Sequence, residues 1–155
     1  MIKMTHAKPN ELKTLTLLLK NFYPIHNIFK KPGKEIEKYT KGLEGTWVLA
    51  KDMKKKGKII GCCFVGKKGS LWRIKHLAVE DAYLHHGVEE SILAYAEQTL
   101  IKKGKVEIHI SENEKLDVEF YENAGYDITD RVPGYHRKDE VCFFLQKTIT
   151  SLEKP

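Results

Sequence analysis

Residues 76–104, HLAVEDAYLHHGVEESILAYAEQTLIKKG, decide the fold. The run Leu71–Val79 ends in apolar residues and predicts a strand, and a helix is predicted to follow because apolar residues then recur every four positions. These residues are Val88, Ile92, Ala96 and Leu100. Between the strand and the helix lies a loop that contains Gly87. Because a helix N-terminus and the backbone N–H groups of such a loop attract anions, the stretch predicts a phosphate site.

The side chains of this loop are unusual for phosphate binding. His85, His86 and Glu89 stand where a phosphate loop would have glycines and no negative charge. A negative charge in the first helical turn stabilises a free helix by up to about 1 kcal/mol, and near a diphosphate it costs a comparable amount or more. The backbone donors of residues 84–88 remain whatever the side chains are. We therefore expect anion binding that is weakened and not abolished.

Length and composition indicate one domain, residues 1–155, of an ordinary globular protein. The chain is 41% hydrophobic and 31% charged, which is typical of soluble domains. The longest apolar run, residues 59–66, is far shorter than the ~20 residues of a membrane span, and the first ten residues lack the apolar segment of a signal peptide. A cytoplasmic location without membrane association is expected, with Cys62, Cys63 and Cys142 buried and reduced.

The formal net charge is +6, but only Arg73, Arg131 and Arg137 are arginines. Proteins that read nucleic acids depend on arginine for bidentate contacts, and the lysines here are spread along the chain. The charge therefore indicates a solvated surface, and nucleic-acid binding is kept only as a third hypothesis. The seven histidines show no convincing metal-ligand spacing, so no metal site is expected.

The remaining elements predict an α/β domain with a mixed sheet, in the order β-α-α-β-β-β-α-β-α-β-β. Before the quoted stretch, we expect a strand at 2–6, helices at 9–23 and 34–43, an aromatic loop at 23–29, and a hairpin of strands 46–51 and 58–65. The second hairpin strand does not alternate, which predicts burial on both faces. After it, we expect strands at 105–111, 127–132 and 140–148 and a helix from Ser111 to Ala124, with Ser111 and Glu114 at capping-box spacing.

This order, with LAVEDAY (77–83) before the long helix and EFYENAGY (119–126) after the next strand, resembles the GNAT superfamily of acyl-CoA-dependent N-acyltransferases. The resemblance implies an α/β fold of the α+β type, with a central mixed, mostly antiparallel twisted sheet of six to seven strands flanked by about four helices. It also implies acetyl-CoA as cosubstrate. A Gly-Tyr loop at 134–135 is similar to that of the protein N-terminal acetyltransferase branch.

The resemblance implies roles for individual residues. The cofactor would lie along the strand end and the loop, with its pantetheine near Asn113; these cofactor positions are Leu77, Ala78, Val79, Leu84, His85, His86, Gly87, Val88 and Glu89. Of the six loop positions, 84–89, only Gly87 matches the family pattern. Tyr121 would protonate the departing thiolate, Glu107 would be the base, and a backbone N–H near a bulge at Val79 would meet the oxyanion. Tyr23, Phe29 and Tyr135 would line the acceptor pocket.

The chemistry of amine acylation fits these residue types. An alkyl amine is mostly protonated at pH 7, so a base is useful, and His109 lies about 6.6 Å from Glu107 on the same strand face. A tyrosine near pKa 10 can protonate a thiolate whose thiol titrates near 8.5. We therefore expect an N-acetyltransferase that acts by direct transfer to a small-molecule amine or a protein or peptide amine. A binding protein of this fold with weak or no catalysis is the alternative, and a homodimer is left open.

Overall fold

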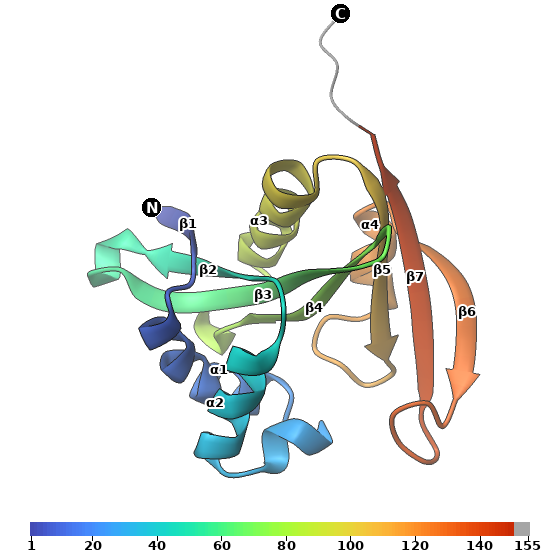
Figure 1. The fold of residues 1–155 in the computed structure, drawn as a ribbon, viewed down its shortest axis with the longest axis horizontal. Coiled ribbons are helices and arrows are strands. Elements are labelled where there is room, and N and C mark those ends of the chain that lie inside the picture. The colour runs from blue at the N-terminus through green and yellow to red at the C-terminus, as the bar shows by residue number, and fades with distance from the viewer. Residues whose placement is uncertain (151–155) are drawn as a thin grey trace, which may run out of the picture.

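The computed structural model describes residues 1–150, which form one seven-stranded sheet in the order β1-β2-β3-β4-β5-β7-β6 (Figure 1). The strands are β1 (Ile2–His6), β2 (Thr46–Asp52), β3 (Lys58–Lys68), β4 (Leu71–Val79), β5 (Gly104–Ser111), β6 (Asp127–Pro133) and β7 (Val141–Ile149). Neighbouring strands are antiparallel except β4 and β5, which are parallel. The predicted mixed, mostly antiparallel sheet is confirmed.

Helices pack on both faces of this sheet. The α-helices are α1 (Leu15–Phe22), α2 (Gly33–Gly42), α3 (Val88–Tyr95) and α4 (Val118–Asn123). Short 3-10 helices lie at Pro9–Thr14, Asn27–Lys30, Met53–Lys55 and Asp81–Tyr83, and a π-helical segment, Ala96–Ile101, continues α3. Figure 1 shows α3 on the face opposite to α1 and α2. Residues 60–66 of β3 are buried between these layers, as their continuous apolar run predicted.

The parallel strands β4 and β5 share only a short ladder. Leu71–Arg73 pair with Lys105–Glu107, and beyond these three residue pairs the strands separate (Figure 1). Strands β1–β4 therefore form one arm of the sheet, and β5, β7 and β6 form the other. The candidate site lies in the space where these two arms separate.

A β-bulge interrupts β4 beside this opening. Ala78 pairs with Cys62 and Lys75 with Phe64, so that His76 and Leu77 together face the single residue Cys63. His76 takes the left-handed conformation, with φ of 55°. The bulge was expected near Val79, which instead stays in the ladder opposite Gly61. The irregularity thus lies two to three residues earlier than predicted.

The predicted capping box at Ser111 and Glu114 is wrong. Ser111 ends β5 and is buried, and α4 begins at Val118. Its N-cap is Asp117, whose side chain accepts a hydrogen bond from the Phe120 N–H at 3.0 Å. Aspartate is as favourable an N-cap as serine. Asp117 also lies closer in the sequence than Ser111 to the apolar residues that α4 buries. Residues 112–117 therefore form a loop at the open end of the sheet.

The three cysteines are buried thiols, as predicted, and burial raises the pKa of Cys63 to about 12. Within residues 1–150, no group of three or more His, Cys, Asp and Glu side chains is placed to hold a metal ion. None of the helices in this part of the chain is both long and apolar enough to cross a membrane.

Candidate active site

A cavity of about 230 Å³ lies where β4 and β5 separate. Its wall is built from both strands and from the loops that close over them. It includes Tyr23, His26, Tyr39, Arg73, Lys75, His76, Leu77, His109, Glu114, Tyr121, Tyr135 and His136. Three residues singled out from the sequence, Tyr121, Tyr23 and Tyr135, thus meet at one cavity although they come from distant parts of the chain.

Tyr121 brings a buried hydroxyl group to this cavity. It lies on α4 with 2% of its surface exposed and packs edge-on against Phe120 and Tyr126. Burial raises the pKa of Tyr121 well above its ordinary value, and the nearby charge of Glu114 raises it further. The hydroxyl group is therefore protonated at neutral pH and can donate a proton or a hydrogen bond.

A chain of hydrogen bonds crosses from β4 through β5 to β7. The Arg73 guanidinium donates to Nδ1 of His109 at 3.0 Å, which leaves the ring proton on Nε2. That Nε2 donates to Glu107 at 2.7 Å, and the other oxygen of Glu107 accepts from Gln146 at 2.7 Å. His109 lines the cavity and Glu107 lies behind it. The sequence-predicted base therefore reaches the cavity through a histidine.

The environment keeps this pair in its reactive charge state. Burial lowers the pKa of His109, although Glu107 partly offsets the effect, and the ring stacks on Phe144 at 3.8 Å between centroids. For Glu107, burial opposes ionisation, but the hydrogen bonds from Gln146 and His109 outweigh it and hold the pKa of the carboxyl below its ordinary value. At neutral pH the site contains a neutral imidazole beside a carboxylate, which is the arrangement of a general base.

The bulge of β4 is fixed from the helical side of the cavity. The buried Tyr23 hydroxyl donates to the Leu77 carbonyl at 2.5 Å. Tyr39 and Nε2 of His76 share a hydrogen bond of 2.7 Å, and burial lowers the pKa of His76 to about 3. Phe29 packs in the core against Tyr23 and His76, with ring centroids 5.8 and 5.2 Å away, and is not on the cavity wall. These contacts hold the strand backbone rigid next to the reactive groups.

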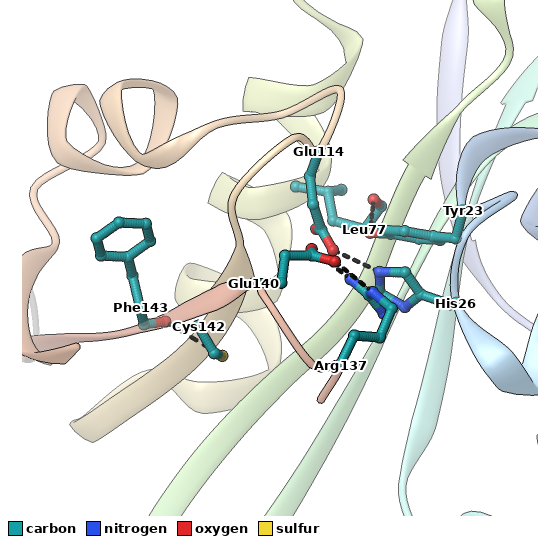
Figure 2. A network of polar contacts seen from close by, with 8 residues as sticks. All are labelled: Tyr23, His26, Leu77, Glu114, Arg137, Glu140, Cys142 and Phe143. Carbon is teal, nitrogen blue, oxygen red and sulfur yellow. Dashed lines mark hydrogen bonds and ion pairs between the residues drawn. The ribbon is translucent and has the colours of Figure 1, made fainter. Parts of the chain in front are cut away.

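An ion pair lies on the cavity wall, and a second lies next to it. His26 bonds Glu114, which joins the loop after α1 to the loop after β5. Figure 2 shows the Arg137–Glu140 pair beside them, with its shorter contact at 2.6 Å. Tyr135, which is 49% exposed, stands at the same mouth with its ring 5.7 Å from that of His109. Three loops from distant parts of the chain thus meet around the opening.

Sequence reasoning missed several residues of this wall. Arg73 and Lys75 occupy alternate positions of β4, and that alternation was the available signal for a charged strand face. His26 and Glu114 stand 88 residues apart, and nothing in the sequence links them. Asn113, the predicted pantetheine contact, is exposed in the loop after β5 with φ of 72° and is not on the cavity wall.

The loop at 84–89 keeps the backbone of an anion site. His85 and Gly87 both take left-handed φ values, 65° and 91°, and Gly87 is the N-cap of α3 without a capping side chain. A Cβ at Gly87 would meet nothing within 4 Å, so the space before the helix is open. His85 and His86 are exposed, Leu84 is partly buried, and Val88 and Glu89 are buried. Burial, together with Glu90, raises the pKa of Glu89. The open backbone before the helix is what binding of a pyrophosphate group would need.

Comparison with known proteins agrees with this geometry. Residues 13–126 match the family model "Acetyltransferase (GNAT) family". No curated protein has a sequence that matches the chain significantly.

Solved structures resemble the chain over almost its whole length. An aminoglycoside 6'-N-acetyltransferase from Enterococcus faecium is 18% identical, covers 99% of each chain and superposes with a TM-score of 0.74. The paia N-acetyltransferase from Thermoplasma acidophilum, in complex with coenzyme A, is 15% identical over 96% of this chain and 99% of its own, with a TM-score of 0.73. Ard1 from Thermoplasma volcanium is 12% identical over 96% and 97%, with a TM-score of 0.77. At these identities the likeness shows the fold.

Proposed function

The chain belongs to the acetyltransferase (GNAT) family, and we propose that it moves an acetyl group from acetyl-CoA directly to a primary amine. One observation carries the proposal: Tyr121 of α4 and His109 of β5, which bonds Glu107, line the same cavity. A proton donor and a proton acceptor facing one small cavity are what acyl transfer from a thioester to an amine needs.

The coenzyme would be held by the strand end and the loop. Backbone N–H groups of Leu84–Glu89 and the α3 N-terminus would bind its pyrophosphate, and the pantetheine would lie along Leu77–Val79 and near Asn113. When bound, acetyl-CoA supplies the activated thioester. Coenzyme A in the complex of the Thermoplasma acidophilum relative supports this choice.

The amine would lose its proton toward His109. The imidazole is neutral because burial lowers its pKa, and Glu107 on its other nitrogen stabilises the imidazolium that forms. Nδ1 is the one ring nitrogen with a lone pair, and Arg73 donates to it, so the Arg73 N–H must turn aside before His109 can accept the proton, directly or through a water. In this scheme Glu107 orients the His109 ring and stabilises its protonated form.

The opposite side of the cavity would handle the leaving group and the oxyanion. Tyr121 keeps its proton because burial raises its pKa, so it would donate a hydrogen bond that stabilises the departing thiolate. The bulge leaves the backbone at His76–Leu77 out of register with β3, and an N–H group of this stretch would meet the carbonyl oxygen. The Tyr23 bond to the Leu77 carbonyl preserves this arrangement.

The acceptor would be a small-molecule amine. A cavity of about 230 Å³, closed by loops, suits a small ligand better than a protein chain. The aminoglycoside acetyltransferase among the similar structures also points to small amines. A protein or peptide amine is the second candidate, favoured by the exposure of Tyr135 at the mouth.

Substitution Tyr121→Phe tests the proposal. General acid catalysis contributes about 10²- to 10⁴-fold, so the release of coenzyme A thiol in the presence of a panel of primary amines should slow at least about 100-fold. Tyr95→Phe, which removes a hydroxyl bonded to His6 at the surface, is the matched control. Equal rates for both variants, or no acetyl-CoA binding by calorimetry at millimolar concentration, would refute the proposal.

A further inference from the structure

Lys75 of β4 differs from the other lysines that the structure describes. Within residues 1–150 four lysines are partly buried, and the rest are exposed. Three of the four are held by a bond: Lys20 donates to a backbone carbonyl, and Lys51 and Lys147 pair with carboxylates. Lys75 forms no hydrogen bond or ion pair with its side chain within the same residues. It lines the candidate active-site cavity, and the other three do not.

The surroundings of Lys75 favour its neutral amine. Burial lowers the pKa of its ammonium group, and the positive charges of Arg73 and Lys68 lower it further. Only the neutral amine of a lysine is a nucleophile, and desolvation or a neighbouring cation is how proteins activate one. The cavity wall therefore carries a primary amine of the protein itself, in a reactive environment, where the amine of a free acceptor would bind.

The acetyl group of bound acetyl-CoA would lie close to this amine. In the proposed reaction the pantetheine lies along Leu77–Val79, and the thioester carbonyl meets the backbone at the bulge. Lys75 immediately precedes that bulge, and Tyr121, which would stabilise the leaving thiolate, lines the same cavity. Groups that are well oriented toward each other react as if at effective concentrations of about 10⁵–10⁸ M. Lys75 can therefore compete with a free amine for the acetyl group.

We propose that Lys75 is a self-acetylation site, which is used when acetyl-CoA is bound and the cavity holds no free amine. Its Nζ attacks the thioester carbonyl, a C–N amide bond forms, and the C–S bond breaks. The proton that Nζ loses passes to the thiolate, directly or through a water, and coenzyme A leaves as the thiol. The inference rests on the proposed acetyl transfer for its donor. An amide is far less reactive than a thioester, so the acetyl group stays on Lys75.

Mass spectrometry of the full chain incubated with acetyl-CoA alone tests the inference. We expect one acetyl group per chain, mapped to Lys75 by peptide analysis, and added at least about 100-fold faster than to the exposed Lys67 and Lys68. The rate should not depend on protein concentration, because the reaction takes place within one chain. Equal labelling of Lys75 and the exposed lysines would indicate unassisted surface chemistry and would overturn the inference.

Two matched variants show whether the fast reaction belongs to this position. Lys75→Arg keeps a positive charge on β4 and should lose the fast labelling, while Lys67 and Lys68 react as in the wild type. Lys105→Arg makes the same change at an exposed position of β5 and should leave the labelling of Lys75 unchanged. Fast labelling that persists at another residue in Lys75→Arg would contradict the assignment.

A panel of free primary amines separates this inference from the proposed function. Acetylation of a free amine by a chain whose Lys75 stays unlabelled in the absence of amines would overturn the inference and leave acetyl transfer standing. Fast labelling of Lys75 without acetylation of any free amine would support the inference and count against transfer to a free acceptor. If neither reaction occurs, both are refuted.

Discussion

Substitution Glu89→Gln should tighten coenzyme A binding and stabilise the fold, and both effects should grow with pH. Glu89 is the second residue of α3, is 1% exposed, and has one carboxylate oxygen buried without a hydrogen-bond partner among residues 1–150. Its pKa is raised by burial first and by Glu90 second. An acid with a raised folded pKa costs nothing below its unfolded value near 4.5, and the cost grows as the pH rises through the folded value.

The magnitude follows from charge and burial. Glutamine keeps the buried polar atoms and removes only the charge, and a charged unsatisfied group costs more than the about 1–3 kcal/mol of a neutral one, so the free energy of unfolding should rise by about 1 kcal/mol at pH 8 and be nearly unchanged at pH 4.5. Toward the pyrophosphate, unit charges roughly 8 Å apart repel by about 2 kcal/mol at an effective dielectric constant near 20. Because solvent screens part of this repulsion, we expect a Kd about tenfold lower at pH 8, where 1.4 kcal/mol corresponds to a factor of ten.

Calorimetric titration with coenzyme A at pH 6 and pH 8, beside urea denaturation at the same pH values, measures both effects. Glu90→Gln is the matched control, because Glu90 neighbours Glu89 in the sequence and has an exposed side chain. If the two variants change the affinity equally, long-range charge is responsible and the buried position is irrelevant. If Glu89→Gln weakens coenzyme binding, the carboxyl group supports the loop, and the reasoning is refuted.

Other substitutions test the fold and the base. Gly61→Ala should destabilise by about 1–3 kcal/mol, because the new Cβ would lie 2.8 Å from Cδ1 of Ile92; thermal denaturation against the wild type measures it, and an unchanged Tm would contradict the packing. The partly buried His76, with its pKa lowered to about 3, should make the free energy of unfolding fall by about 1.4 kcal/mol per pH unit from about pH 6.5 downward; a flat urea-derived profile over pH 6 to 4 would count against a neutral ring in the folded protein. Glu107→Gln removes the group that favours the imidazolium form of His109, so the maximal rate should fall while the acid limb of the pH–rate profile moves to lower pH. An acid limb that moves to higher pH would contradict this role.

The sequence predicted the sheet and its strand order along the chain because apolar periodicity is a local property. Strand β4 was placed at its observed bounds, and the second hairpin strand was correctly expected to be buried. Errors arose where a local signal competed with tertiary packing. Ser111 satisfies the capping-box pattern, yet it is the last residue of β5. Asp117 caps α4 instead.

The site was less predictable than the fold. Tyr121 was identified from its surrounding motif, and the structure places it on the cavity wall. Glu107 was singled out without Arg73, the residue opposite it on β4. The pairing of β4 with β5 brings the two residues together only in the folded sheet. The contact of His26 with Glu114 depends on three loops converging, and periodicity carries no information about loop positions.

The short ladder between β4 and β5 has a mechanical consequence. Three residue pairs join the two arms of the sheet at one end. The arms can therefore move apart about a hinge at Arg73 and Glu107, where the pairing ends. At the other end, two ion pairs connect the arms: His26–Glu114, and the surface pair Lys115–Asp81, in which Nζ lies 2.9 Å from Oδ1. The exposed pair, Lys115–Asp81, weakens in salt. We therefore expect the cavity to open more often at high ionic strength. Amide exchange near Lys115 and Asp81 should quicken in salt, while exchange at Arg73 and Glu107 should not.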